Sequence, residues 1–179
     1  MALAPELDSA RPGYVLVVED DVPTRELLAA ILRTEGIEHR LSSNGHEAME
    51  QAHSVTPALV VLDMHLPSVQ GDAVATALRI DFGHRLPVLA MSASLEAGLA
   101  ERLGAYAYLQ KPFEVEDFVQ LVRRGLELAV LNAAAHTSQE RMEAALRRQR
   151  EAFDRARTAG PDVAIREPAS GDRAAQFRA

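Results

Sequence analysis

Short, unbroken apolar runs at regular intervals are the feature of this sequence that most restricts its fold. They are YVLVV (14–18), IEHRLS (37–42, the weakest), ALVVL (58–62), LPVLAM (86–91) and AYAYL (105–109). Each run has the length of a strand, and the strong runs do not alternate with polar residues, so both faces of each strand are expected to be buried. This pattern is typical of a parallel sheet covered by helices on both sides.

Segments of helical character separate the apolar runs. Pro23 stands where the first would open, Asn44 is a predicted N-cap for the second, and Gly71–Ile80 forms the third. Leu95–Leu103 and the stretch from Glu114 onward supply the fourth and fifth. Five strand–helix pairs predict an α/β fold with a small, doubly wound parallel sheet. A β/α barrel would require eight such pairs.

Composition excludes several classes of protein and of site. The chain has no cysteine, which rules out disulfide scaffolds, thiolate metal sites and cysteine nucleophiles. Its first residues lack the pattern of a secretory signal, and no apolar run approaches the ~20 residues of a membrane span. We therefore expect a soluble, cytoplasmic protein with no membrane partner. Residues 1–136 carry 10 basic and 19 acidic side chains, a balance that disfavours broad nucleic-acid binding by this part.

Polar side chains follow the strong apolar runs. Glu19–Asp21 follow the first, Asp63 and Ser92 follow the next two, and Lys111, the single lysine among 19 basic residues, follows the last. Taken one at a time, these residues are explained as helix caps, a turn residue and a solvated charge. Because the carboxyl ends of parallel strands lie at one edge of a sheet, we expect all of them to converge there.

An edge with these side chains suits a metal ion and a phosphoryl group. Clustered carboxylates repel one another, and a hard divalent ion, Mg²⁺ above all, relieves that repulsion and takes a phosphate oxygen as a further ligand. A lysine ammonium and a hydroxyl opposite would hold the other phosphoryl oxygens. A central carboxylate could then act as the nucleophile of an in-line transfer and become an acyl phosphate.

Four stretches, in this order, give the chain a family resemblance: VLVVEDDVPTRELL, ALVVLDMHLPSVQG, VLAMSAS and AYLQKPF. With them the chain resembles response-regulator receiver domains, the chemotaxis-regulator-like modules of two-component signalling. The resemblance covers residues 13–128, after a flexible start at residues 1–12. It implies a flavodoxin-like, doubly wound, five-stranded parallel sheet in the order 2-1-3-4-5, here with a C-terminal helical extension. It also implies a phosphoacceptor that signals through altered protein–protein interaction, and we expect it to stand alone because no recognisable second domain follows.

The resemblance assigns roles to the matching acidic residues. Asp63 would be the phosphoacceptor. Glu19, Asp20 and Asp63 would hold Mg²⁺, with the backbone carbonyl of His65 as a further ligand. The implied donor of the phosphoryl group is a sensor histidine kinase or a phosphotransfer protein, and the implied output is an unknown downstream protein.

The other matching residues lie toward the end of the receiver region. Lys111 would pair with the phosphoryl group, Ser92 would hydrogen-bond it, and Tyr108 would act with Ser92 as the switch. The Lys111–Pro112 bond is expected to be cis. The segment between Ser92 and Lys111 is shorter than is usual in the family, so we expect the output face, but not the site, to depart from the family's geometry.

Residues 129–159 are predicted to form a helical extension, with a T-x-x-E capping signal at Thr137, and residues 160–179 to be disordered. Heptad counting from Phe118 places apolar residues at eight of twelve core positions, although Gly125 is a poor helix residue. A continuous coiled coil that makes a homodimer and a separate helix folded back on the domain therefore both remain open.

Three other functions compete with that of a receiver. An aspartyl-nucleophile phosphatase or phosphotransferase commonly needs a second acid two residues after the nucleophile, where this chain has His65. A transcriptional or DNA-binding regulator would act through the arginine-rich helix at 138–158, but its interleaved acidic residues are more typical of a solvated or dimerising face. A degenerate receiver is disfavoured because every site position carries a competent residue. The chain is not expected to be an enzyme beyond catalysing its own phosphorylation and dephosphorylation.

Overall fold

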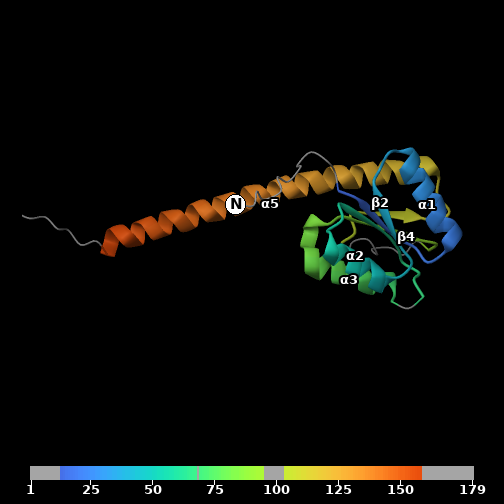
Figure 1. Ribbon diagram of the computed structural model, residues 1–179, viewed down its shortest axis with the longest axis horizontal. Coiled ribbons are helices and arrows are strands. Elements are labelled where there is room, and N and C mark those ends of the chain that lie inside the picture. Colours follow the sequence, from blue (N-terminus) through green and yellow to red (C-terminus); the bar gives the residue numbers. More distant parts are fainter. Residues whose placement is uncertain (1–12, 68, 95–102, 159–179) are drawn as a thin grey trace, which may run out of the picture. The chain divides into compact units, whose positions relative to one another are not determined.

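A computed structural model describes residues 13–67, 69–94 and 103–158, which contain an open five-stranded sheet (Figure 1). The strands are β1 (Val15–Val18), β2 (His39–Ser42), β3 (Leu59–Asp63), β4 (Val88–Ser92) and β5 (Ala107–Gln110). Their order is β2-β1-β3-β4-β5, and each neighbouring pair is parallel. The prediction of a doubly wound, flavodoxin-like sheet in the order 2-1-3-4-5 is confirmed.

Helices cover both faces of this sheet. They are α1 (Val22–Thr34), α2 (Gly45–Ser54), α3 (Gly71–Phe82), the short 3₁₀ helix η1 (Gly83–Arg85) and α5 (Val115–Thr158). Because successive strand residues point to opposite faces, Leu16 and Val18 pack with α2 and α3, whereas Val15 and Val17 pack with α1 and the first turns of α5. Figure 1 shows α1 on one side of the sheet and α2 and α3 on the other.

Burial separates the central strands from the edge strands. Every residue of β1, β3 and β4 is buried, whereas β2 and β5 are buried only in part. A strand with one neighbour needs less apolar surface than one between two neighbours. The observed limits fall within two residues of the predicted ones for edge and central strands alike: β2 begins at His39, β4 at Val88 and β5 at Ala107, each two residues after its apolar run starts.

Side-chain caps begin the first two helices. The Asp21 carboxylate accepts the backbone N–H of Thr24 at 2.9 Å at the start of α1. The Asn44 side chain accepts the N–H of Glu47 at 2.9 Å at the start of α2, which confirms the predicted N-cap. Each cap satisfies one of the backbone donors that a helix leaves unpaired in its first turn.

The α5 helix is continuous over 44 residues, so the extension after residue 128 does not begin as a separate helix in the described part of the chain. The capping signal at Thr137 marks no helix start, because the residue lies inside α5. The Thr137 hydroxyl donates to the carbonyl of Ala133 at 3.1 Å, which is a bond made by a threonine inside a helix. The residues before it read AVLNAAAH and are mostly strong helix formers, so nothing interrupts the helix there.

Gly125 lies where α5 packs closely against β3. A Cβ atom at this position would be 2.9 Å from Leu59 Cδ1 and 3.0 Å from the Tyr106 hydroxyl oxygen. The Tyr106 hydroxyl in turn donates to the carbonyl of Leu121. The low helix propensity of glycine is therefore accepted here because it allows close packing of helix on sheet.

Several predicted segments fall outside the described residues: positions 1–12, positions 95–102 of the predicted fourth helix, and the predicted disordered residues 160–179. The chain divides into two compact units, one up to Ser138 and one from Gln139 onward.

Across 13–67, 69–94 and 103–158, no helix is both long enough and apolar enough to cross a membrane.

Candidate functional site

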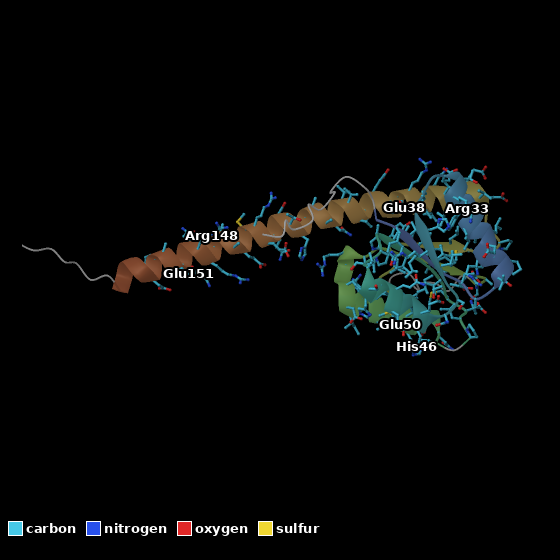
Figure 2. All side chains as sticks on the ribbon, viewed as in Figure 1. Arg33, Glu38, His46, Glu50, Arg148 and Glu151 are labelled. Atoms are coloured by element: carbon cyan, nitrogen blue, oxygen red, sulfur yellow. The ribbon has the colours of Figure 1, made fainter. Side chains whose placement is uncertain are left out.

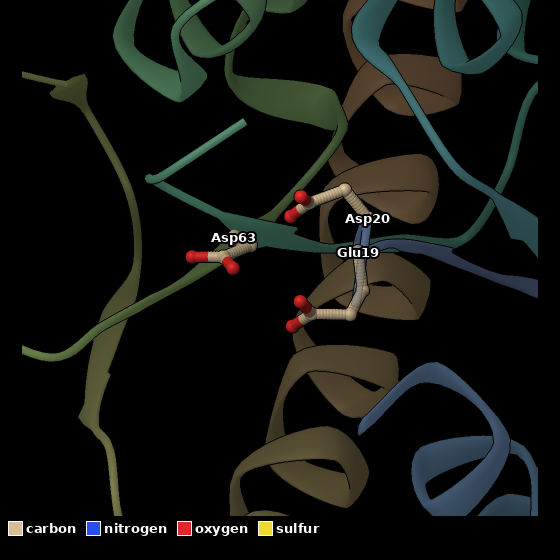
Figure 3. A group of neighbouring side chains, drawn as sticks. All are labelled: Glu19, Asp20 and Asp63. Atoms are coloured by element: carbon tan, nitrogen blue, oxygen red, sulfur yellow. The ribbon is translucent and has the colours of Figure 1, made fainter. Parts of the chain in front are cut away.

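Three carboxylates meet at the carboxyl edge of the sheet (Figure 3). Glu19 and Asp20 directly follow β1, and Asp63 is the last residue of β3, the strand that pairs beside β1. Each offers one oxygen to a group in which all three oxygens lie within 4.8 Å of one another. Glu19 and Asp63 are buried, while Asp20 is accessible to solvent. These acidic residues were expected to converge because they follow strand ends, and the structure brings them together.

Lys111 joins two of these carboxylates. Its Nζ donates to Glu19 Oε2 at 2.6 Å and to Asp63 Oδ2 at 2.8 Å. The side chains of Glu19 and Asp63 are only 1% and 7% exposed, and that of Lys111 is 23% exposed. One ammonium therefore offsets part of the repulsion between two buried carboxylates, and the only lysine of the chain lies at the centre of the site.

The shared ammonium sets the charge states. Burial opposes ionisation of Asp63, but hydrogen bonds from Lys111 and from the His65 N–H outweigh it and hold the pKa of Asp63 below its ordinary value of 3.8. Burial raises the pKa of Glu19, and Lys111 only partly opposes that rise. Burial would lower the pKa of Lys111, yet its bonds to Asp63 and Glu19 raise it above 10.5. At neutral pH the structure therefore presents an ionised Asp63 beside a charged ammonium.

Backbone N–H groups and the side chain of Arg25 hold the acidic residues in place, and the sequence did not reveal all of these contacts. The N–H of His65 donates to Asp63 Oδ1 at 3.1 Å, and the N–H of Asp21 donates to Glu19 Oε1 at 3.3 Å. Arg25 Nη1 donates to the carbonyls of Glu19 and Asp20 at 2.7 and 3.1 Å. The one sequence signal for Arg25 is its position in the first turn of the helix that follows the acidic run.

Asp21 does not join the cluster of carboxylates. Its side chain is turned to the start of α1, where it accepts both the N–H and the hydroxyl of Thr24, the latter at 2.6 Å. The Thr24 hydroxyl and N–H lower the pKa of Asp21. The acidic run therefore divides into two residues at the site and one helix cap.

Gly71 lets α3 begin directly against the Asp63 backbone. A Cβ atom at Gly71 would lie 2.6 Å from the carbonyl oxygen of Asp63 and 2.6 Å from the Cα of Met64. The N–H of Gly71 also donates to the carbonyl of Met64 at 3.3 Å. The sequence identifies Gly71 only as a turn residue. It does not show that two backbone segments approach each other closely at this position.

Ser92 ends β4 next to the end of β3, as predicted. Its buried hydroxyl lies 3.4 Å from Nδ1 of His65 and accepts the N–H of Ser94 at 3.3 Å. Its carbonyl accepts the N–H of Lys111 at 2.8 Å. Ser92 therefore connects the loop after β3 with the end of β5.

Tyr108 lies on β5 and is half-buried. Its hydroxyl donates to the carbonyl of Ser94 and lies 3.5 Å from that of Ser92. Tyr108 thus contacts the backbone at the end of β4 and not the carboxylates. The Lys111–Pro112 bond is cis, as expected.

The donor set suits Mg²⁺. Three carboxylates and one ammonium leave an excess of negative charge, and carboxylate oxygens are the ligands that a hard divalent cation prefers. The accessible Asp20 leaves one side of the cluster open to water, which Mg²⁺ retains in its coordination shell.

Comparison with known proteins agrees with this geometry. A family model described as the response regulator receiver domain matches residues 15–123. The chain belongs to this family. Receiver domains act in two-component systems and typically carry a phosphorylated aspartate and bind Mg²⁺ at an acidic pocket such as the one formed by Glu19, Asp20 and Asp63.

The match covers different shares of the relatives of this receiver domain. Transcriptional regulatory protein PdtaR of Mycobacterium tuberculosis is 34% identical over 146 residues, which are 77% of this chain and 70% of PdtaR. DNA-binding response regulator MtrA of Mycobacterium leprae is 34% identical over 115 residues, 63% of this chain but only 50% of MtrA. The crystal structure of TrrA from Thermotoga maritima in complex with Mg²⁺-BeF is 29% identical, with a TM-score of 0.58, and the match covers 63% of this chain and 98% of that one.

Proposed function

We propose that this receiver domain takes a phosphoryl group on Asp63 from a histidine kinase or a phosphotransfer protein. The observation that carries the proposal is the arrangement of a buried, ionised Asp63 between the Lys111 ammonium and two further carboxylates. Response regulators as a class interact with such donors. On this proposal the chain is a phosphoacceptor that promotes its own phosphorylation and dephosphorylation and is not otherwise an enzyme.

The transfer follows from the charges at the site. A carboxylate oxygen of Asp63 attacks the phosphorus in line with the leaving group, a new O–P bond forms, and the bond from phosphorus to the donor atom breaks. Lys111 and the Ser92 hydroxyl hold the phosphoryl oxygens. Mg²⁺, held by Glu19, Asp20, Asp63 and the carbonyl of His65, would neutralise the charge on those oxygens.

On this proposal the signal begins when the phosphoryl group replaces contacts that Lys111 and Ser92 make in the unphosphorylated site. Lys111 bonds Glu19 and Asp63, and the Ser92 hydroxyl contacts His65 and Ser94. A phosphoryl oxygen at Ser92 would draw the hydroxyl away from those partners. The Tyr108 hydroxyl contacts the carbonyls of Ser92 and Ser94. A shift of the backbone at Ser92 would therefore move the Tyr108 side chain at the surface of β5.

We further take residues 13–128 as the receiver domain and residues 129–159 as an extension that belongs to the output. Signalling then proceeds through altered binding of a downstream protein. A phosphatase acting on small phosphoesters is the weaker alternative, because His65 lies where such an enzyme would need an acid, and turnover of a phosphoester would support it.

Labelling with a small phosphodonor tests the proposal. Wild-type protein incubated with acetyl phosphate and Mg²⁺ should gain a phosphoryl group that alkali or hydroxylamine removes, as expected of an acyl phosphate. EDTA should suppress the labelling, and Asp63→Asn should abolish it. Equal labelling of Asp63→Asn and wild type would refute the assignment of Asp63.

Nucleic-acid binding through α5 is the second candidate. Arg141 and Arg148 are exposed and lie seven residues apart, on the same side of the helix. Exposed acidic residues, among them Glu143 and Glu151, interrupt the basic surface. A steep fall in affinity for duplex DNA with rising salt would support this candidate.

A further inference from the structure

The second unit of the chain exposes a stripe of apolar side chains. Met142, Leu146 and Phe153 lie on α5 at spacings of four and seven residues, so they fall on one side of the helix. They are 63%, 52% and 68% exposed. Gln149 continues the stripe between them, and the flanking Ala145 and Ala152 are small and exposed. Most of the stability of a protein helix comes from packing of its apolar face and not from helix propensity, so a covered stripe would stabilise this part of α5.

The charges beside the stripe identify what covers it. Glu143 and Arg150 lie seven residues apart on the same flank, and both are exposed. If two copies of the helix run antiparallel with Met142 opposite Phe153 of the second copy, Leu146 falls opposite Gln149. Glu143 then faces Arg150 of the second copy, twice by symmetry.

A parallel pair lacks this complementarity. Each residue would then face its own counterpart, Met142 on Met142 and Phe153 on Phe153. Arg150 would lie beside Ala145 of the second copy, so no ion pair would form across the interface. In the antiparallel pair, by contrast, Ala145 meets Ala152, and two small residues let the helices approach closely.

We propose that residues 139–154 of α5 form an antiparallel two-stranded coiled coil with the same residues of a second copy of this chain. The sequence alone leaves a homodimer through the C-terminal helix open; the stripe and its flanking charges assign it an orientation and a register. Glu143 also lies 3.9 Å from Arg147 on its own helix, but that pair is exposed and weak. The coiled coil does not depend on phosphorylation of Asp63.

Cysteine cross-linking tests the orientation, because the full-length chain has no cysteine of its own. Met142→Cys and Phe153→Cys are prepared as single variants with tags of different mass. After mild oxidation the equimolar mixture should give the mixed disulfide dimer, and neither variant alone should cross-link, because like positions are about 16 Å apart along the axis in the antiparallel pair. Cross-linking of each single variant with itself, or of none, would overturn the proposal.

Charge reversal tests the register. Arg150→Glu places a second carboxylate opposite Glu143 and should weaken the dimer by about tenfold or more in sedimentation equilibrium. The double variant Glu143→Arg/Arg150→Glu should restore it. Arg148→Glu makes the same change of charge two residues away, about 200° around the helix from Arg150, and should leave the dimer intact. Figure 2 labels Arg148 on this part of α5. An equal effect of Arg148→Glu and Arg150→Glu, or no rescue by the double variant, would contradict the register.

Discussion

Lys111 shows why one lysine persists in a chain that otherwise uses arginine. Its ammonium is a compact point charge that reaches Glu19 and Asp63 together, at 2.6 and 2.8 Å. A guanidinium is a wider, planar fork and would not fit between two buried carboxylates without moving one of them. Lysine is favoured here because the space between the two carboxylates is small, which the composition of the chain cannot show.

Lys111→Arg should fold but switch poorly. The positive charge is kept, so we expect a loss of no more than about 1–2 kcal/mol in the free energy of unfolding. The wider head group should misplace the contact to the phosphoryl oxygens. NMR shifts of Tyr108 before and after phosphorylation measure the response, with circular dichroism as the check on folding. A response equal to that of wild type would contradict this role of Lys111.

The raised pKa of Lys111 predicts a loss of stability at alkaline pH. The folded protein holds this proton more tightly than the unfolded chain, so the stabilisation is complete below the ordinary value of 10.5 and is lost as the pH rises through the higher folded value. The difference in unfolding free energy between wild type and Lys111→Met, measured in EDTA from neutral pH upward, should therefore shrink above pH 10.5. A difference that stays constant would show that the ammonium does not stabilise the fold.

At the scale of elements, the site depends on how closely α3 begins against the end of β3. Gly71→Ala would place a Cβ 2.6 Å from backbone atoms of Asp63 and Met64, which have little room to move. We expect destabilisation of about 1–3 kcal/mol, measured by urea unfolding, together with slower labelling of Asp63. Gly36→Ala is a useful comparison, since a Cβ at Gly36 meets nothing within 4 Å and the variant suffers only from the positive φ of that position, far from the site. If Gly71→Ala kept the stability and the labelling rate of wild type, the close approach of α3 to the end of β3 would be contradicted.

How much of the fold could be predicted from the sequence also depends on the element. The buried central strands β1, β3 and β4 were predicted within a residue or two, because burial on both faces demands an unbroken apolar run. The edge strands β2 and β5 also fall within two residues of their predicted limits, although they are buried only in part. The capping signal at Thr137 misled because a T-x-x-E pattern also occurs inside a helix, where the hydroxyl bonds a carbonyl one turn back.

The site itself was predictable to the extent that topology places strand ends together. Glu19, Asp20, Asp63 and Lys111 meet as expected. What the sequence could not show were contacts that depend on the path of the backbone, such as the bonds from Arg25 to the carbonyls of the acidic run. No sequence motif indicates these contacts, so they can be identified only in the folded structure.

At the scale of the whole molecule, Mg²⁺ should stabilise the fold. A cation that binds the three carboxylates only in the native state adds its binding free energy to the stability. We expect the melting temperature of the chelated protein to rise with added Mg²⁺. Asp20→Asn, at the accessible member of the cluster, should lose most of that rise without loss of stability in EDTA. The same rise in wild type and variant would place the ion elsewhere.

The position of the phosphoryl group tests the central claim most directly. After incubation with acetyl phosphate and Mg²⁺, the protein is treated with borohydride, which reduces an aspartyl phosphate to homoserine, and the peptides are sequenced by mass spectrometry. The proposed function predicts homoserine at position 63 alone, and none in Asp63→Asn or in protein kept in EDTA. Homoserine at position 20 or 21, or unmodified Asp63 in protein that carries phosphate, would contradict it.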